Sequence, residues 1–340
     1  MNNAKLKEMI TEIKKAPSVY YPSEFWKKLN KIHNAQLLHS GFDNFKRSVT
    51  VHYFNWKILM IIRHQLSPII SELKRGNFAP IFRSRFLNPR SQIRSYVTSF
   101  NHITAFIYKI YVAYLSDYVY RKDKLKLLDR IKEPLVGNPF IVSYKKNFVS
   151  QDLCNSVHEF YSITDKINSQ KHMEVAEIGA GYGRLAYVFL QALPKISYCI
   201  IDIPPALFIS QEYLSKVFPE EKIFLFRPFS SFGEIKEEFE AARIRFIMAH
   251  QIKYLPDKYF NLMISISTLH EMTRRQISNY INEINRLTDG YFYNKQWIRS
   301  YAKDNSCIRE DEYPIPKNWR TIYQHPHPIQ RLFFEALYEI

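Results

Sequence analysis

The spacing of apolar residues changes character partway along the chain. From Met1 to about Ile167 apolar positions recur mostly every three or four residues, a pattern typical of helices broken at proline and glycine. It predicts helices over residues 21–38, 53–76 and 95–131. A short extended stretch follows, and then a helix for which either Ser150 or Asp152 is the expected N-cap.

Beyond Lys171 apolar runs of strand length alternate with amphipathic stretches of helix length. The predicted strands are 173–179, 197–202, 222–226, 243–249, 259–267 and 290–296. The predicted helices between them are 183–193, 206–218, 231–242 and 274–287. This order indicates an α/β fold with a mostly parallel sheet and helices on both faces. We therefore predict a mainly helical domain over residues 1–150 and an α/β domain over residues 151–340.

Composition adds a charge asymmetry to this division. An apolar fraction of 46% predicts a folded chain. Residues 1–150 hold 26 Lys and Arg against 9 Asp and Glu, whereas residues 151–340 hold 22 against 23. Such a basic half attracts phosphate-bearing ligands, nucleic acid or anionic lipid headgroups, although a solvated basic face explains it equally well.

Neither a disulfide framework nor a metal site is indicated. The three cysteines, Cys154, Cys199 and Cys307, are scattered without CxxC spacing, and His325 and His327 have no assigned carboxylate partners. The N-terminus lacks a secretory apolar core, and the apolar stretch from Trp56 to Ile70 is shorter than the ~20 residues of a membrane span. We expect a soluble, cytoplasmic protein without a bound metal.

Three of the chain's eight glycines, Gly179, Gly181 and Gly183, lie within five residues, between a predicted strand and a predicted helix. Such a turn lets the backbone approach a ligand closely and leaves N–H groups free at the helix start, as nucleotide-type sites require. The dinucleotide pattern GxGxxG would need glycine where Arg184 stands, so NAD is disfavoured. Asp202 ends the next strand, where its carboxylate can accept ribose hydroxyls, or can cap the following helix.

His270 and Glu271 follow the apolar strand 259–267, at the carboxyl edge where open α/β sheets bind ligands. A neutral histidine at physiological pH can take the proton of a hydroxyl nucleophile. In the alternative interpretation, His270 caps a helix or orients Glu271.

Together these segments resemble class I S-adenosylmethionine (SAM)-dependent methyltransferases, whose fold is Rossmann-like. The loop from Glu177 to Gly183 resembles their first motif, Asp202-Ile203-Pro204-Pro205 their Asp-Leu-Pro turn, and His270-Glu271 the His-Asp-Trp segment of small-molecule O-methyltransferases. The resemblance implies that His270 is the general base, with Glu271 in the acid's position. It also implies a set of cofactor-binding residues: Glu177, Gly179, Ala180, Gly181 and Gly183 at the methionine end, Asp202 at the ribose, and Ile203 and Gln251 at the adenine.

Residues 171–300 and the segment Gly137-Asn138-Pro139-Phe140 before them are similar to bacterial sugar O-methyltransferases of surface polysaccharides. This resemblance implies a hydroxyl acceptor on a nucleotide sugar, a lipid-linked sugar or a glycan. The basic half would then meet its phosphate or the inner membrane face. Polar residues expected to line the acceptor pocket are Gln151, Asp152, Tyr182, Arg184, Tyr293 and Asn294.

Other functions stay open. A pI near 9.5 and aromatics interspersed with Arg and Lys over residues 81–121 also fit an RNA methyltransferase. The chain lacks the Asn/Asp-Pro-Pro-Tyr/Phe and Pro-Cys motifs of base methylation, but a 2′-hydroxyl methyltransferase needs neither. A non-catalytic scaffold with this fold and, more remotely, a dehydrogenase are the remaining alternatives.

Overall fold

A computed structural model describes residues 3–48, 67–86, 102–167, 172–301 and 307–340. Residues 49–66 and 87–101 lie outside these ranges. They include most of the predicted helix 53–76, most of the apolar stretch from Trp56 to Ile70, and the start of the predicted helix 95–131. Contacts divide the chain into two compact units. The first holds the described residues of 1–34, 163–327 and 332–340, and the second those of 35–162 and 328–331.

The first unit is built on an eight-stranded sheet in the order β12-β13-β9-β8-β4-β5-β7-β6. Its strands are β4 Met173–Ile178, β5 Ile196–Asp202, β6 Ile223–Phe224, β7 Ile244–Met248, β8 Phe260–Ile266, β9 Thr288–Trp297, β12 Arg320–Pro326 and β13 Phe333–Glu339. The strands from β6 to β9 pair in parallel, and β13 and β12 add two antiparallel strands beyond β9. The predicted α/β fold with a mostly parallel sheet is therefore confirmed.

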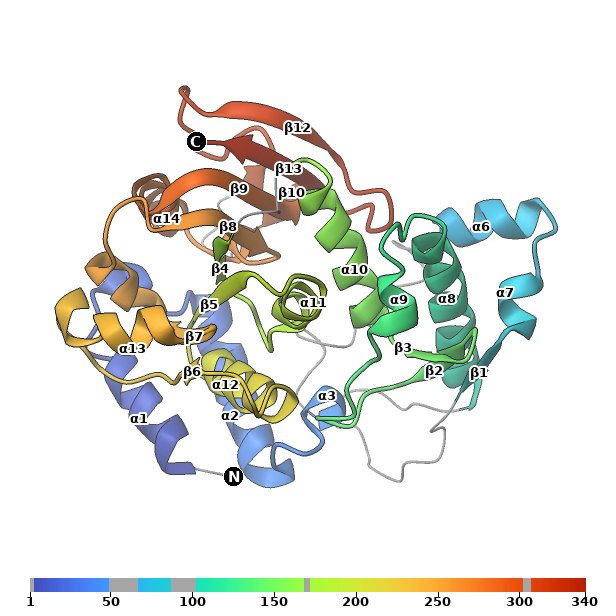
Figure 1. Cartoon of the computed structure of the whole chain (residues 1–340), viewed down its shortest axis with the longest axis horizontal. Coiled ribbons are helices and arrows are strands. Elements are labelled where there is room, and N and C mark those ends of the chain that lie inside the picture. The colour runs from blue at the N-terminus through green and yellow to red at the C-terminus, as the bar shows by residue number, and fades with distance from the viewer. Residues whose placement is uncertain (1–2, 49–66, 87–101, 168–171, 302–306) are drawn as a thin grey trace. The chain divides into compact units, whose positions relative to one another are not determined.

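Helices cover both faces of this sheet (Figure 1). From β4 the chain moves through α11 (Arg184–Ala192) to β5, and through α12 (Ala206–Val217) toward β7, in one direction across the sheet. From β8 it moves the opposite way, through α14 (Arg274–Leu287) to β9. Because parallel crossovers are right-handed, opposite directions place helices on opposite faces. The remaining helical turns of this stretch are η2 Phe232–Glu234, α13 Lys236–Ala241, η3 Ala249–Tyr254 and η4 Leu269–Glu271.

The sheet forms the core of the unit. Every residue of β5 and β7 is buried, as expected for parallel strands covered on both faces. One charged pair lies within it: Arg245, which is fully buried on β7, forms an ion pair with Glu174 of β4.

The C-terminal strands were not predicted from the sequence. They comprise β12 and β13 and a short antiparallel hairpin of β10 (Arg299–Tyr301) and β11 (Cys307–Arg309). The strand β13 pairs with β9 along its whole length, from Phe333 opposite Trp297 to Glu339 opposite Tyr291. The ladder between β13 and β9 joins distant parts of the chain, and local periodicity carries little information about such a pairing.

The N-terminal segment also departs from the predicted division at residue 150. Its elements α1 (Asn3–Ile13), η1 (Ser18–Tyr20) and the first part of α2 (Glu24–Ser40) belong to the first unit. Gln276 of α14 donates through Nε2 to the carbonyls of Val19 and Tyr21, at 3.2 and 2.8 Å. Helical spacing predicts a helix but not its packing partner, so the sequence could not place this segment.

The second unit is mainly helical, as predicted, with one small antiparallel sheet. Its elements are α3 Phe45–Ser48, α6 Ser67–Lys74, α7 Ala79–Phe82, β1 Ser84–Phe86, α8 His102–Tyr120, α9 Leu127–Arg130, β2 Val142–Tyr144, β3 Asn147–Val149 and α10 Gln151–Thr164. Ser150 caps α10, because its Oγ accepts the Leu153 N–H at 3.0 Å. None of the helices within the described ranges is long and apolar enough to cross a membrane.

Candidate functional site

The loops that leave the carboxyl ends of β4, β5, β7 and β8 meet at one edge of the sheet. Strand order reverses at β4, because the chain continues to β5 on one side and later returns to β8 on the other. In open α/β sheets the crevice at such a switch point is where ligands bind. The residues predicted to bind the cofactor and to act in catalysis all come from these strands and loops.

The glycine loop after β4 adopts a backbone conformation that residues with side chains could not adopt without strain or steric overlap. Gly179 and Gly183 have φ angles of +74° and +84°, a left-handed conformation that favours glycine. A Cβ at Gly179 would overlap the Thr268 side chain, and one at Gly183 would lie 2.9 Å from Leu214 Cδ1. Thr268, which sequence analysis missed, also donates through Oγ1 to the Gly179 carbonyl at 3.2 Å.

Glu177 lies at the carboxyl end of β4 and is buried. Its Oε2 accepts the Tyr198 hydroxyl of β5 at 2.7 Å. Ala180, within the glycine loop, is also buried.

Asp202 ends β5 and joins that strand to the glycine loop. Its Oδ2 accepts the Gly181 N–H at 3.0 Å, and its Oδ1 accepts the Ile203 N–H at 2.7 Å. Burial raises the pKa of Asp202 to about 7, although both backbone hydrogen bonds oppose the shift. Each carboxylate oxygen accepts one backbone bond here, so lone pairs remain for ribose hydroxyls.

The predicted adenine-binding residue Gln251 lies in η3, after β7, and is fully buried. Its Oε1 accepts the Met248 N–H at 2.8 Å, and its Nε2 donates to the Arg227 carbonyl at 2.9 Å. These bonds use the amide oxygen and one amide N–H, so an adenine contact would have to use the second N–H. The role of Gln251 stays a prediction.

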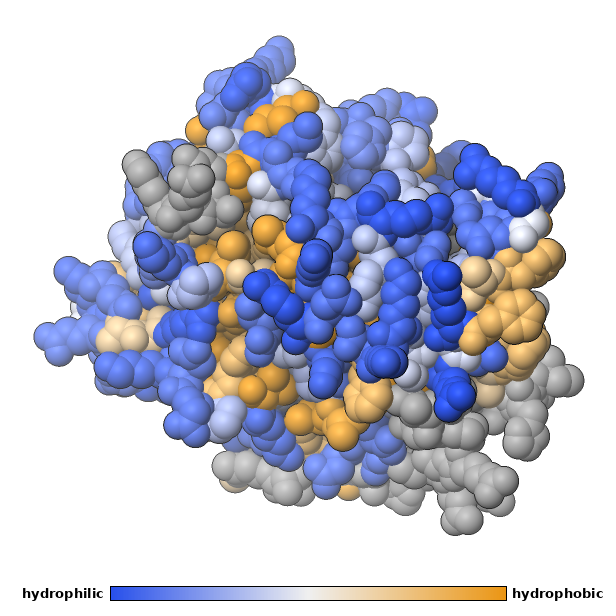
Figure 2. All heavy atoms as spheres, turned by 45° about the vertical axis from the view of Figure 1, so that its right-hand side comes forward, coloured by the Kyte–Doolittle hydropathy of each residue, from blue (hydrophilic) through white to orange (hydrophobic). Residues whose placement is uncertain are grey.

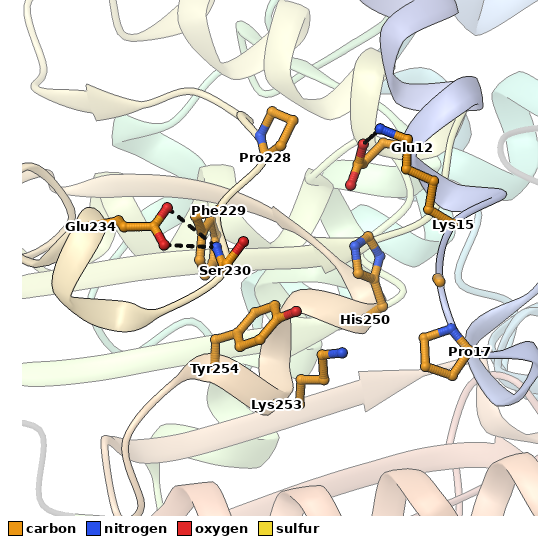
Figure 3. Close-up of a pocket in the computed structure, with 11 residues that line it drawn as sticks. Glu12, Lys15, Pro17, Pro228, Phe229, Ser230, Glu234, His250, Lys253 and Tyr254 are labelled. Atoms are coloured by element: carbon orange, nitrogen blue, oxygen red, sulfur yellow. Dashed lines mark hydrogen bonds and ion pairs between the residues drawn. The ribbon is translucent and has the colours of Figure 1, made fainter.

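His250, one residue earlier, lines a cavity of about 280 Å³ (Figure 3). The cavity lies between η3, the loop after β6 and the end of α1, and Figure 3 shows the imidazole pointing into it toward Glu12. His250 is 6% exposed, and its Nδ1 has no hydrogen-bond partner in the described part of the chain. Burial lowers the pKa of His250, against the opposing charge of Glu12. The imidazole of His250 therefore lines the cavity, with a buried Nδ1 that no described residue hydrogen-bonds.

His270 follows β8 in η4 and is held on two sides. Its Nδ1 lies 2.9 Å from Oε1 of Gln296 on β9, and its ring stacks on Trp297 with centroids 4.8 Å apart. Its Nε2 is buried and has no hydrogen-bond partner among the described residues. Burial lowers the pKa of His270 to about 4, opposed by the hydrogen bond with Gln296. The imidazole is thus neutral at physiological pH.

Glu271 lies beside His270, with Oε1 3.8 Å from His270 Nε2. Its Oε2 accepts the indole N–H of Trp26, on α2, at 2.8 Å. Burial and the charge of Asp202 raise the pKa of Glu271 to about 8, and the Trp26 bond opposes the shift. Buried ionisable groups with displaced pKa values are a frequent mark of functional sites.

A face of α2 supplies further polar groups that sequence analysis missed. One turn after Trp26, Asn30 donates through Nδ2 to the Pro204 carbonyl at 3.1 Å, directly after the Asp202 turn. Asn30 is 8% exposed, and its Oδ1 has no partner among the described residues. More than 170 residues separate Asn30 from Pro204, so no local pattern could reveal this contact.

The predicted acceptor-lining residues are dispersed. Tyr182 is buried edge-to-face against Tyr213, and Arg184 opens α11. The neighbours Tyr293 and Asn294 point to opposite faces of β9, as alternation requires. The Tyr293 hydroxyl donates to Glu335 Oε2 at 2.8 Å, whereas the side-chain Oδ1 of Asn294 accepts from Gln296 Nε2 at 3.0 Å.

Gln151 and Asp152 open α10 and are counted with the second unit. Their part in an acceptor pocket stays a prediction, as does the expectation that His325 and His327 hold no metal.

No protein-family model and no curated protein sequence matches the chain. Similar solved structures include a SAM-dependent methyltransferase from Aquifex aeolicus, which is 14% identical, with 53% of this chain and 88% of that chain covered at a TM-score of 0.35. The PH0226 protein from Pyrococcus horikoshii is 12% identical over 56% and 92% of the two chains, at 0.39. Mitomycin 7-O-methyltransferase MmcR is 12% identical over 55% of each chain, at 0.38. At these values the likeness adds no weight to any residue's role, which rests on the geometry above.

Proposed function

We propose that this protein is a SAM-dependent O-methyltransferase that methylates a hydroxyl of a sugar or glycan. One observation carries the proposal: the glycine loop, the Asp202 carboxylate and the unpartnered Nε2 of His270 come from loops at the same edge of the sheet. A buried nitrogen without a hydrogen-bond partner costs stability, and a hydrogen bond from an acceptor hydroxyl would recover that cost.

The residues at this edge fit the proposed cofactor. The backbone at Gly179 and Gly183 leaves no room for side chains, so the loop can approach a ligand closely. Asp202 offers acceptor lone pairs to two ribose hydroxyls. Glu177, two residues before Gly179, carries a carboxylate that accepts the Tyr198 hydroxyl, and we assign it to the ammonium group of the cofactor. When bound, SAM supplies a methyl group on a cationic sulfur that an oxygen nucleophile can attack.

His250, in addition to Gln251, is our candidate for the adenine edge. The amide of Gln251 is engaged by the backbone of Met248 and Arg227, whereas His250 lines the cavity of Figure 3 and no described residue hydrogen-bonds its Nδ1. An exocyclic amino group can donate to the neutral Nδ1 of His250. Lys253, which also lines the cavity, can donate to a ring nitrogen.

His270 supplies the general base in this proposal. Its neutral ring offers Nε2 to the acceptor hydroxyl, and general-base assistance of this kind is worth ~100 to 10,000-fold in rate. Glu271, whose Oε1 lies 3.8 Å from His270 Nε2, can accept a hydrogen bond from a neighbouring hydroxyl.

The second unit supports an acceptor on an anionic carrier or at an anionic membrane surface. Phe78, Phe82 and Phe106 are 50%, 85% and 53% exposed, and Lys109 lies 5.2 Å from the Phe106 ring. Figure 2 shows apolar side chains at the surface toward the right of the view, beside strongly hydrophilic ones. Exposed aromatics among cations suit the interface of anionic lipid bilayers.

The experiment that tests the function is methyl transfer from isotope-labelled SAM to a panel of nucleotide sugars and glycans, with RNA as the comparison acceptor. We expect an O-methylated sugar that resists alkaline cleavage, unlike a methyl ester. Transfer to RNA alone would identify a ribose 2′-hydroxyl of RNA as the acceptor, in place of a nucleotide sugar or glycan. Binding of S-adenosylhomocysteine without transfer to any hydroxyl would contradict the enzymatic proposal.

A further inference from the structure

Gln296, on β9, has an amide whose orientation is fixed by its neighbours. Its Nε2 lies 3.1 Å from the Ser265 carbonyl oxygen, an atom that can only accept. Its Oε1 lies 3.0 Å from the Thr268 N–H and 3.3 Å from the His270 N–H, and backbone N–H groups can only donate. Exchanging the amide oxygen and nitrogen would break all three contacts. The oxygen of Gln296 therefore faces the His270 loop.

This orientation decides which nitrogen of His270 carries the proton. Because Oε1 of Gln296 has no hydrogen to give, the 2.9 Å contact requires His270 Nδ1 to be the donor. The Trp297 N–H also approaches Nδ1, but at 3.5 Å this contact is too long to compete. Nε2 is then the acceptor nitrogen, and it is the one without a partner.

We infer that Gln296 is a positioning residue that fixes His270 as the Nδ1–H tautomer, with the Nε2 lone pair directed toward the acceptor hydroxyl. The catalytic part of this inference, that His270 acts as the general base, rests on the proposed function. The structural part, the tautomer and orientation of His270, does not. Stacking on Trp297 sets the plane of the imidazole, and Gln296 sets its rotation within that plane. The hydroxyl proton passes to Nε2 as the oxygen bonds the methyl carbon, while the carbon–sulfur bond breaks with its electron pair left on sulfur.

A neutral amide in this position has a consequence that a carboxylate would not have. An amide orients the ring without stabilising its charged form by a full negative charge. His270 therefore stays unprotonated well below neutral pH and is ready to accept a proton throughout the physiological range. Gln296→Glu would place a carboxylate against Nδ1, stabilise the imidazolium and raise the pKa of His270.

The structural content can be measured without substrate. The ligand-free protein is labelled with ¹⁵N-histidine, and the His270 signals are assigned by their loss in His270→Asn. We expect the Nδ1–H tautomer in the wild type, a mixture of tautomers in Gln296→Leu, and titration at higher pH in Gln296→Glu. The matched control is Gln211→Glu, a similarly buried glutamine that accepts the Phe226 N–H at 2.8 Å. His270 signals that match the wild type are expected in this control.

The catalytic content is measured on the same variants. Orienting partners of metal-bound histidines are worth ~10 to 100-fold in activity, and we expect a loss of this order in kcat for Gln296→Leu with KM changed little. Gln296→Glu should move the acidic limb of the kcat profile to higher pH. A wild-type Nε2–H tautomer, or a His270 titration unchanged in Gln296→Glu, overturns the inference even if methyl transfer occurs. The Nδ1–H tautomer in a protein that methylates no hydroxyl would leave the positioning intact and refute the proposed function.

Discussion

Ionisable residues at the two ends of the central strands of the first unit differ in how far their charges are compensated. Toward the amino ends of β4 and β7, Glu174 pairs with Arg245, whose Nε donates to the Ala242 carbonyl at 2.9 Å and whose guanidinium lies 4.7 Å from the Phe239 ring. At the carboxyl edge, Asp202, Glu271 and His270 have displaced pKa values and no opposite charge to pair with among the described residues.

This difference distinguishes residues that stabilise the sheet from residues that we propose bind a ligand. Burial of a charge is tolerated when a partner compensates the lost hydration, as in the pair of Glu174 and Arg245. The desolvation of Asp202, Glu271 and His270 at the carboxyl edge is not compensated by an opposite charge, and hydrogen bonds from the hydroxyl groups of a ligand can compensate it. Substitution should therefore cost stability in the first group and function in the second.

The largest expected effect is the loss of turnover in His270→Ala. We expect a ~100 to 10,000-fold lower kcat, because the general base is removed, with S-adenosylhomocysteine affinity and melting temperature near those of the wild type. The matched control is His172→Ala, a histidine that is 57% exposed at the opposite end of the sheet. A near-normal rate in His270→Ala would assign His270 a purely structural role.

Arg245→Met should instead unfold the protein more easily. Removing one member of a fully buried ion pair costs ~3 to 5 kcal/mol in the free energy of unfolding, and because Glu174 is 21% exposed we expect a loss at or below the lower end of that range. Urea denaturation measures this loss, while kcat and cofactor affinity of the folded fraction should be retained. Adding Glu174→Gln should recover part of the stability. A loss of activity in step with the loss of stability would remove the distinction between the two groups.

Asp202→Ala should weaken cofactor binding and leave the fold intact. The charged hydrogen bonds to ribose that it removes are worth ~1.5 to 3 kcal/mol. Calorimetric titration with S-adenosylhomocysteine measures the change, and Asp257→Ala, on an exposed turn, serves as the control. Unchanged affinity would refute the ribose assignment.

The smallest effect is a pH dependence with opposite signs for binding and stability. With a pKa of about 7, Asp202 becomes ionised between pH 6 and 8, and affinity for S-adenosylhomocysteine should rise ~10-fold over that range. The pKa of Asp202 is raised from its ordinary value of 3.8, so the folded state binds the proton more tightly than the unfolded state. Its contribution to the stability of the ligand-free protein is therefore present at low pH and lost as pH rises through about 7.

The Asp202→Asn variant should lack the decrease in stability that ionisation of Asp202 causes, and it should melt at a higher temperature than the wild type at pH 8. The decrease caused by ionisation of Glu271, with a pKa of about 8, should remain in the variant. Identical melting curves for wild type and variant across pH 5 to 8 would contradict the account of Asp202 as a buried, uncompensated carboxyl.

Much of the sheet and the glycine loop after β4 could be predicted because their signals are local. The alternation of apolar runs and amphipathic helices located the parallel strands from β4 to β9, and the glycine cluster located the turn after β4. His270 could be proposed from the sequence because it comes shortly after an apolar strand. Each of these features lies within a few residues of the sequence pattern that predicts it.

The rest could not be predicted because it depends on contacts between distant segments. Trp26 reaches Glu271 across 245 positions of sequence, and β13 joins β9 by a ladder that leaves no local mark. Gln296 is an intermediate case. It lies two residues after the predicted Asn294, on the same face of β9, so alternation along the strand could have identified it.

The most direct test of the central claim is calorimetric titration of the purified protein with S-adenosylhomocysteine, with NADH as the control ligand. The account predicts micromolar binding of S-adenosylhomocysteine, abolished or strongly weakened in Asp202→Ala, and no binding of NADH. Binding of NADH alone, or of neither ligand, would contradict it, because the glycine loop and Asp202 would then not form the cofactor site.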